Sequence, residues 1–408
     1  MPFVEPVTAD SLAFATLFAL MICVAWSRAR VWFLPALLVC SCAVLVTWLK
    51  PLDLLVLALF LGVPFLLIRF LWGNQSAQTR GLAAIVILSQ TLLFIYLRKY
   101  EWIGDYPWLD HPVAIVGLSY MLFRIIHLIV EAPYLGHLPF GPVRYVTFVT
   151  SFWTIISGPI QRYEDFTTGL KGIGRPEPAE VVQAGHRLIN GLIKAFVIAP
   201  VFLKMSDISA VATPDANWFD FAIVLYAYPA YLYLNFSGYT DLVVAGSRLC
   251  GFRTMPENFD KPYLARNLLD FWSRWHMSFG TWIRQYVFNP MSKHLLHWGP
   301  RRFENLFLAF SVLTTFILVG VWHGTTANFV VFGLLHGLGI ILISFYSYSL
   351  KALIGSKRRR AFLENPFVRG VSVLFCFHFV CGTILLFPNR LGELNTAFGQ
   401  FFTAQGWL

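Results

Sequence analysis

The sequence predicts an all-α polytopic membrane protein with about ten to twelve transmembrane helices, and composition is the first observation behind this prediction. Of the 408 residues, 57% are hydrophobic and 13% are charged, whereas an ordinary soluble domain is about 25% charged. The second observation is length, because one bilayer crossing takes about 20 apolar residues and the chain has room for roughly a dozen. Little remains for a soluble domain, so we expect one integral-membrane domain over residues 1–408.

About twelve apolar runs are long enough, or nearly so, to form these helices. They lie at residues 10–26, 31–49, 52–72, 82–97, 112–130, 145–161, 188–206, 218–235, 236–252, 304–322, 325–349 and 367–388. The first is expected to be a membrane helix and not a removable signal peptide, because no basic segment precedes it. The run ending at Leu97 and the stretch at residues 242–251 are short or interrupted by charge, so one or two segments are expected to be re-entrant.

The basic residues predict the orientation of the chain, because Lys and Arg concentrate in cytoplasmic loops. The net charge of +10 is scattered between apolar runs, which argues against a nucleic-acid-binding face. The densest cluster lies between Lys351 and Arg360, so we expect a cytoplasmic loop there and an extracytoplasmic N-terminus. With this orientation, Arg98 and the basic patch at residues 162–175 lie on the extracytoplasmic side of the membrane. Either a central span is re-entrant or these residues serve a polyanionic substrate.

Residues 256–290 are rich in aromatic and charged side chains and predict an in-plane amphipathic helix. With about 100° per helical residue, the aromatic, apolar and histidine side chains from Phe271 to Tyr286 fall within an arc of roughly 140°. Most side chains on the opposite arc are polar or small. We expect this helix in the cytoplasmic headgroup region, on the same side as the 351–360 cluster, with its basic face toward lipid phosphates or an acidic partner.

Two histidines are the candidates for chemistry. His323 lies where one apolar run ends and the next begins, beside Gly324, and an ionisable side chain at membrane depth usually marks a functional path. His276 lies at the edge of the aromatic arc, where a lone histidine would more simply be a packing residue. A pair of histidines instead favours acid–base transfer, since a neutral imidazole can remove the proton of a hydroxyl that attacks an acyl carbon. No third metal ligand lies near them in the sequence, so no metal is expected.

Two further patterns predict helix packing. Ser119, in the sequence GLSYM at residues 117–121, lacks the last glycine of a nucleophile elbow and lies in a helical run. Gly333 and Gly337 flank His336 with the spacing that lets two helices approach closely.

Three stretches carry a resemblance to a known family. They are GFRTMPENFDKPY at residues 251–263, FWSRWHMS at 271–278 and Trp322-His323-Gly324. They resemble the signature of the membrane-bound O-acyltransferases. NFSGYTD at residues 235–241 and GPI at 158–160 are similar to the bacterial branch that includes teichoic-acid D-alanyl transferases and alginate O-acetyltransferases. The resemblance covers residues 96–337 or so.

The resemblance implies a fold in which transmembrane and in-plane helices surround a central passage, in the cytoplasmic membrane of a bacterium. It implies that His323 is the catalytic histidine and His276 the second family histidine. We expect His323 to act as the general base, and His276 to orient the donor or the acceptor or to polarise the thioester carbonyl. The donor would be a cytoplasmic acyl thioester, carried by an acyl carrier protein or coenzyme A, with no bound cofactor. The acceptor would be a hydroxyl of a cell-envelope polymer or an accessory membrane or periplasmic protein.

Six polar residues are candidates for binding. We expect Asn258, Arg274 and Asn328 to position polar groups of the substrates, and Arg266, Arg284 and Lys293 to dock an acidic carrier protein. For the second set, attraction to anionic lipid is an equal alternative. The bacterial branch often reads Arg-Asp-Tyr where this chain reads Arg284-Gln285-Tyr286, which removes a carboxylate. The acyl group, D-alanyl or acetyl, stays open.

Two other functional classes compete with the acyltransferase. The first is a transporter or flippase of an envelope precursor, in which the histidines relay protons. The absence of an inverted repeat in the sequence counts against it. The second is a scaffold that only recruits partners.

Overall fold

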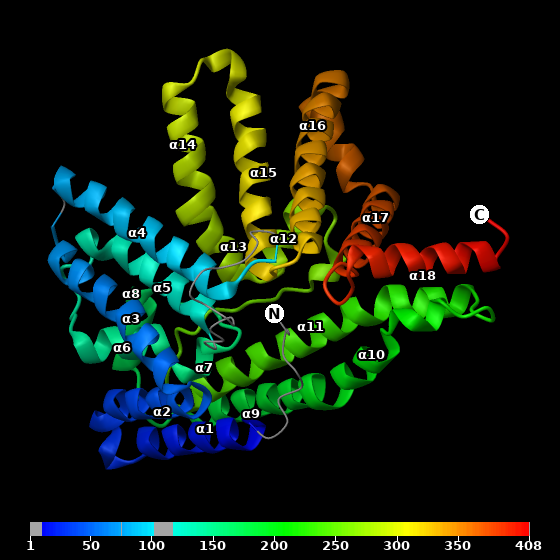
Figure 1. The fold of residues 1–408 in the computed structure, drawn as a ribbon. Coiled ribbons are helices and arrows are strands. Elements are labelled where there is room, and N and C mark those ends of the chain that lie inside the picture. The colour runs from blue at the N-terminus through cyan, green and yellow to red at the C-terminus, as the bar shows by residue number, and fades with distance from the viewer. Residues whose placement is uncertain (1–9, 75, 102–116, 408) are drawn as a thin grey trace. The chain divides into compact units, whose positions relative to one another are not determined.

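The computed structural model describes residues 10–74, 76–101 and 117–407, and its regular elements in these ranges are helices (Figure 1). The one β-type pairing within them is an isolated bridge between Phe259 and Trp275. The all-α fold is therefore confirmed. Helices suit apolar segments in lipid, because each helix satisfies its own backbone hydrogen bonds.

Seven helical segments of the described ranges are long and apolar enough to cross a membrane. They are residues 28–47 with α2 (Phe33–Trp48), α3 (Pro51–Leu71), residues 81–98 of α4 (Ala77–Arg98), residues 178–211 with α9 (Pro178–Leu192) and α10 (Ala199–Met205), residues 301–323 with α15 (Glu304–His323), α16 (Ala327–Glu364) and α17 (Pro366–Ile384). A shorter apolar helix, α1 (Asp10–Trp26), precedes them. The polytopic membrane class is confirmed, with fewer full-length helices in these ranges than the ten to twelve expected.

Part of the difference lies in α11 (Trp218–Leu249), which joins two runs that were expected to be separate spans. The helix continues through Asn235 and Ser237 at the expected boundary, and even Pro229 lies inside it. A long apolar run was divided into two spans because one bilayer crossing takes about 20 residues. A helix, however, continues for as long as its backbone hydrogen bonds can form.

The run at residues 145–161 differs in the opposite sense, because it is broken into α6 (Pro142–Thr150) and α7 (Phe152–Ile155). Remote side chains satisfy the backbone groups at the break. Ser41 Oγ accepts a hydrogen bond from the Phe152 amide at 3.0 Å. The guanidinium of Arg124, which is 1% exposed in α5 (Leu118–Glu131), donates to the carbonyls of Phe148 and Val149 at 2.8 and 3.0 Å. Helix ends need such partners when they are buried.

The single in-plane helix expected between Phe271 and Tyr286 is wrong. The structure has α12 (Leu268–Arg274), α13 (Met277–Ile283), a π-helical turn (Arg284–Phe288) and then α14 (Asn289–Trp298). His276 interrupts the helix with a left-handed backbone conformation, φ +46° and ψ 54°. The side chains before and after this residue therefore do not share one helical face.

The basic cluster at residues 351–360 is helical and not a loop, because it lies in the last part of α16, which is kinked at Gly355. α15 and α16 form an antiparallel hairpin beside α14 and α17 (Figure 1). The cluster therefore lies at the same end of this hairpin as Arg301, which precedes α15. In α13, Phe279 stacks on Trp322 with 4.4 Å between ring centroids, at the other end of α15. The α12–α13 segment therefore contacts the end of the hairpin opposite the basic cluster, and the cytoplasmic side expected for both stays a prediction.

Glycines allow α15 and α16 to pack closely. A Cβ atom on Gly320 would lie 2.0 Å from the Phe329 carbonyl oxygen, and one on Gly333 would lie 2.3 Å from the Phe316 carbonyl oxygen. Neither position has room for a side chain, so the backbones of the two helices are in direct contact. The packing role expected for Gly333 is confirmed, and His323 lies on the same hairpin.

The chain forms two compact units. One contains residues 194–237 and 258–407, with a core of aromatic and aliphatic residues that includes Phe236, Phe271 and Trp275. The other contains residues 238–257 and the described residues before 194, with Trp153 among its fully buried side chains. Ser119, expected to be a packing serine, is buried in this second unit.

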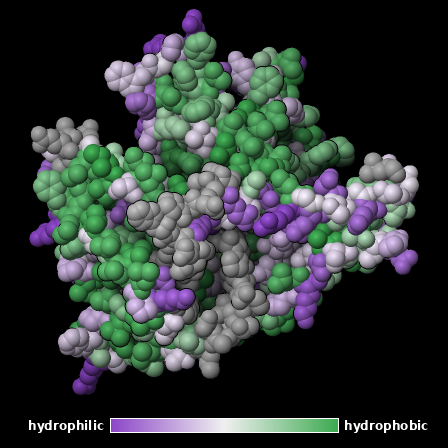
Figure 2. Space-filling view, in the orientation of Figure 1, coloured by the Kyte–Doolittle hydropathy of each residue, from purple (hydrophilic) through white to green (hydrophobic). Residues whose placement is uncertain are grey.

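Large hydrophobic side chains are exposed along the helices of the hairpins. On α15, α16 and α17 they include Leu306, Phe310, Leu318, Leu342, Phe345, Phe367, Leu374 and Phe375. Figure 2 shows hydrophobic residues in green along the sides of these helices and hydrophilic residues in purple near their tips. An apolar surface of this extent is unfavourable in water and suits lipid tails.

Candidate active site

His323 is the last residue of α15, at the turn into α16, and only 7% of the residue is exposed. Its ring centroid lies 4.5 Å from that of Trp322, 5.0 Å from that of Phe387 and 5.8 Å from that of Phe332. These rings restrict the orientation of the imidazole. A general base needs such a defined orientation toward the proton that it removes.

His276 lies in the break between α12 and α13 and is 2% exposed. The chain on both sides of it pairs with the segment that begins at Asn258. The Met277 amide donates to the Asn258 carbonyl at 3.0 Å, and the Asp260 amide donates to the Arg274 carbonyl at 2.9 Å. A left-handed conformation is unfavourable for a residue other than glycine and persists where its surroundings hold it. Here two backbone hydrogen bonds bracket the strained residue.

The structure brings the two histidines to one aromatic cluster. The ring centroid of Trp322 lies 6.0 Å from that of His276 and 4.5 Å from that of His323. Phe279 and Phe236 cover His276, with centroids at 5.2 and 4.8 Å. Burial lowers the pKa of His276 to about 3, so its imidazole is neutral near pH 7.

Of the residues predicted to position substrates, Asn258 lies against His276, with 3.2 Å between Asn258 Oδ1 and His276 Nδ1. Arg274 and Asn328 have other partners. Arg274 Nε donates to Asp270 Oδ1 at 2.7 Å, and the Asn328 amide donates to the carbonyl of Asn389. These contacts hold α12 and the start of α16 in place, so neither side chain is directed at the histidines by its hydrogen bonds.

A third histidine has a structural role. Trp272 Nε1 donates to His336 Nδ1 at 3.2 Å, and His336 Nε2 lies 2.9 Å from Thr383 Oγ1. The Thr383 hydroxyl donates to the Val380 carbonyl, so the Nε2–H of His336 is the donor to Thr383. Both nitrogens are satisfied, and the ring joins α12, α16 and α17. Within the described ranges, no three His, Cys, Asp or Glu side chains are grouped as metal ligands.

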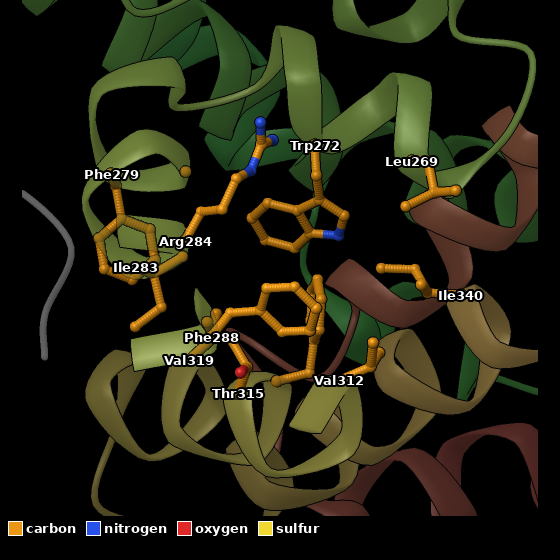
Figure 3. Close-up of a pocket in the computed structure, with 12 residues that line it drawn as sticks. Leu269, Trp272, Phe279, Ile283, Arg284, Phe288, Val312, Thr315, Val319 and Ile340 are labelled. Atoms are coloured by element: carbon orange, nitrogen blue, oxygen red, sulfur yellow. The ribbon is translucent and has the colours of Figure 1, made fainter. Parts of the chain in front are cut away.

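An apolar cavity of about 150 Å³ lies beside this site, between α12, α13, the π-helical turn, α15 and α16 (Figure 3). Its walls include Trp272, Phe279, Val312 and Val319, and Arg284 lies among the lining residues. A cavity of this size in an apolar lining can hold a small apolar group such as an aromatic ring. The three residues predicted to dock a carrier protein are all exposed. Arg266 precedes α12, Arg284 begins the π-helical turn, and Lys293 lies in α14.

The second unit contains a charged network that the sequence did not identify as a site. Arg187 in α9 forms a bidentate pair with Glu257, at 2.6 and 2.5 Å, and its Nε donates to Asp241 of α11 at 2.8 Å. Arg248 also contacts Glu257, at 3.1 Å. Charged residues inside the motifs of so apolar a chain are the signal that could have indicated this network. The two arginines of this network hold Glu257, which precedes Asn258 in the sequence.

Comparisons with known proteins agree with these features. The sequence profile of MBOAT, the membrane-bound O-acyltransferase family, matches residues 41–382. A teichoic acid D-alanyltransferase of Bacillus subtilis (strain 168) is 29% identical over 351 residues, which are 83% of this chain and 86% of that protein. A teichoic acid D-alanyltransferase of Streptococcus thermophilus is 28% identical over 289 residues, 68% of this chain and 69% of that protein. A probable alginate O-acetylase AlgI of Pseudomonas fluorescens is 31% identical over 310 residues, 73% of this chain and 56% of that protein.

The family profile covers most of the chain, including both histidines, the cavity and the hairpin that carries His323. The relatives are named for the transfer of an acyl group, which decides between the enzyme and the transporter or scaffold. The protein is a multi-pass membrane O-acyltransferase, and the chain belongs to the membrane-bound O-acyltransferase family.

Proposed function

We propose that the protein transfers a D-alanyl or acetyl group from a cytoplasmic thioester to a hydroxyl of a cell-envelope polymer or of an accessory export partner, in the cytoplasmic membrane of a bacterium. The observation that carries this proposal is a pair of buried histidines, His276 and His323, whose rings both contact the ring of Trp322. An apolar cavity lies next to them. The relatives named for teichoic acid and for alginate support the two acyl groups and the class of acceptor.

In the proposed reaction His323 acts as the general base. The imidazole takes the proton of the acceptor hydroxyl while its oxygen bonds to the thioester carbonyl carbon. The carbon–sulfur bond then breaks, and the departing sulfur takes up the proton from His323. An ester and a free thiol result, and no cofactor is needed. Purified protein in liposomes, supplied with D-alanyl or acetyl thioester of an acyl carrier protein or of coenzyme A, should release thiol and ester in equal amounts.

In this proposal the donor occupies the cavity next to His323. The α15 residues that line it, Val312 to Val319, precede His323 by 4 to 11 residues, which is about 6 to 16 Å along a helix. They therefore lie toward the end of the hairpin that carries the basic cluster at residues 351–360. If that end is cytoplasmic, a donor arriving from the cytoplasm meets the cavity before it meets His323.

The orientation can be tested by labelling. Because the cluster at residues 351–360 has the densest positive charge, we expect it to face the cytoplasm. A single cysteine at Lys357, in a variant without the native cysteines, should resist a membrane-impermeant thiol reagent in intact cells and react after the cells are opened. Ready labelling in intact cells would reverse the orientation and the proposed sides of donor and acceptor.

A charge reversal tests the docking of the donor. Arg284 is exposed and lines the cavity, so its positive charge can steer an acidic carrier protein or a phosphate of the donor. We expect Arg284→Glu to weaken carrier binding at least tenfold in detergent at low salt, by an electrostatic effect that added salt reduces. The control is Arg369→Glu, which changes the net charge equally at an exposed site on α17. Equal binding by both variants would assign Arg284 to lipid contacts instead.

A further inference from the structure

The side-chain amide of Asn258 is oriented by its surroundings. The Ser278 backbone amide donates to Asn258 Oδ1 at 3.1 Å, and the Ser278 hydroxyl donates to the same oxygen at 2.7 Å. The opposite amide orientation would place the Asn258 NH₂ group against the Ser278 backbone N–H, so that two donors would face each other. Asn258 is 0% exposed, which makes such a mismatch costly. The oxygen must therefore be the atom that faces Ser278.

This orientation determines the tautomer of His276. His276 Nδ1 lies 3.2 Å from Asn258 Oδ1, and a carbonyl oxygen only accepts hydrogen bonds. The proton of the neutral imidazole is therefore on Nδ1, and the lone pair is on Nε2. That Nε2 atom is buried and has no hydrogen-bond partner among the residues that the structure describes. The same holds for Nδ2 of Asn258.

We infer that Asn258 is a positioning residue that keeps His276 in the Nδ1–H tautomer, and that His276 Nε2 accepts a hydrogen bond from the acceptor hydroxyl. This rests on the proposed function. Of the groups that react, the thioester oxygen and sulfur are hydrogen-bond acceptors, and the hydroxyl is the only donor. A neutral Nε2 cannot donate, so His276 does not polarise the thioester carbonyl. Its task is to hold the acceptor hydroxyl for the base.

The backbone around His276 supports this role. The Asn258 carbonyl accepts from the Met277 amide at 3.0 Å, so main chain and side chain of one residue hold both the backbone and the ring of the histidine site. Among the residues that the structure describes, Phe236 of α11, Phe279 of α13 and Trp322 of α15 pack their rings on His276, and none of these three side chains titrates. His323, whose ring centroid lies 4.5 Å from that of Trp322, is a titratable neighbour of this cluster.

The tautomer can be measured without any assay of activity. In protein labelled with ¹⁵N-histidine and reconstituted in bilayers, solid-state NMR distinguishes a protonated ring nitrogen from one with a lone pair, and the signal of His276 is assigned by its loss in His276→Gln. We expect a neutral ring at pH 7 with the proton on Nδ1. In Asn258→Leu, which removes the oxygen, the fixed preference for Nδ1 should be lost. A proton on Nε2 in the wild-type protein would overturn the inference.

Kinetics then test the role of Asn258 in transfer. We expect Asn258→Leu to lower kcat by about 10²-fold or more, as for a catalytic histidine held in the wrong tautomer, while the KM for the thioester donor changes little. The matched control is Asn395→Leu, the same exchange at an exposed position of α18 (Leu391–Ala404), which should leave kcat unchanged. Wild-type transfer by a folded Asn258→Leu variant would contradict the inference.

Asn258→Asp separates positioning from simple packing. A carboxylate keeps the acceptor for Nδ1–H, so the tautomer is retained, but its negative charge raises the pKa of His276. Transfer should then fall at a higher pH than in the wild-type protein, because protonation of Nε2 removes the acceptor as the pH drops through the raised pKa. An unchanged pH profile would contradict the inference. If the tautomer is as expected but no thioester is consumed by wild-type protein, the proposed function fails and the assignment of the tautomer stands.

Discussion

Replacement of His323 by asparagine should lower acyl transfer by about 10²- to 10⁴-fold, the usual contribution of general acid–base catalysis. Asparagine is polar and close to histidine in size, so it can occupy the space among Trp322, Phe332 and Phe387. It cannot take up a proton near neutral pH. The measurement is the rate of transfer by purified protein that elutes as a single species and unfolds at the wild-type temperature.

The matched control is His294→Asn, which makes the same change at an exposed histidine of α14. It should leave the rate unchanged, which shows that loss of a histidine is harmless away from the site. His323→Ala should be as inactive as His323→Asn. A folded His323→Asn protein that transfers at nearly the wild-type rate would remove His323 from the mechanism and leave it a packing residue.

The second large effect is on folding. We expect Gly320→Ala to destabilise the protein by about 1–3 kcal/mol or more, because the new methyl group would lie 2.0 Å from the Phe329 carbonyl oxygen and 2.9 Å from its carbon. Those atoms belong to the backbone of α16, so α15 and α16 must move apart. His323 is three residues further along α15, so transfer should fall together with the thermal unfolding temperature in detergent.

Gly370→Ala is the control for this substitution. Gly370 lies in α17, and a Cβ there would meet no atom within 4 Å. The exchange should therefore leave the protein as stable as before or up to about 1 kcal/mol more stable, since alanine favours a helix. Equal unfolding temperatures for the two variants would show that the hairpin adapts to a side chain at Gly320, and that the close contact is not required.

Several features of the protein could be predicted from the sequence because they depend on composition or on local pattern. A chain with 13% charged residues and apolar runs of about 20 residues satisfies its backbone polar groups in lipid by forming helices. His323 stood out because an ionisable residue between two apolar runs is unfavourable without a function. Gly333 stood out by its spacing from Gly337, and close packing at this position follows from the missing side chain.

Other features depended on partners that lie far away along the chain. The break at Ser151 exists because Ser41 and Arg124 satisfy the backbone groups on its two sides, and nothing in the local pattern around residue 151 shows these partners. Likewise, nothing in the local sequence around Asn235 indicates whether the apolar run forms one helix or two. In the structure it is one helix, α11.

The sequence by itself determined the membrane class, the helical fold, the family resemblance and the pair of candidate histidines, because each follows from composition or from residues that are adjacent in the chain. The tertiary structure decided that His276 interrupts a helix and that the ring of Trp322 contacts the rings of both histidines. It also decided that Asn258 Oδ1 lies 3.2 Å from His276 Nδ1. The periodicity of residues 271–286 assumed a continuous helix. The hydrogen bonds that Asn258 accepts from Met277 and Ser278 hold the left-handed turn. Asn258 lies outside that window, and only a folded chain brings those atoms together.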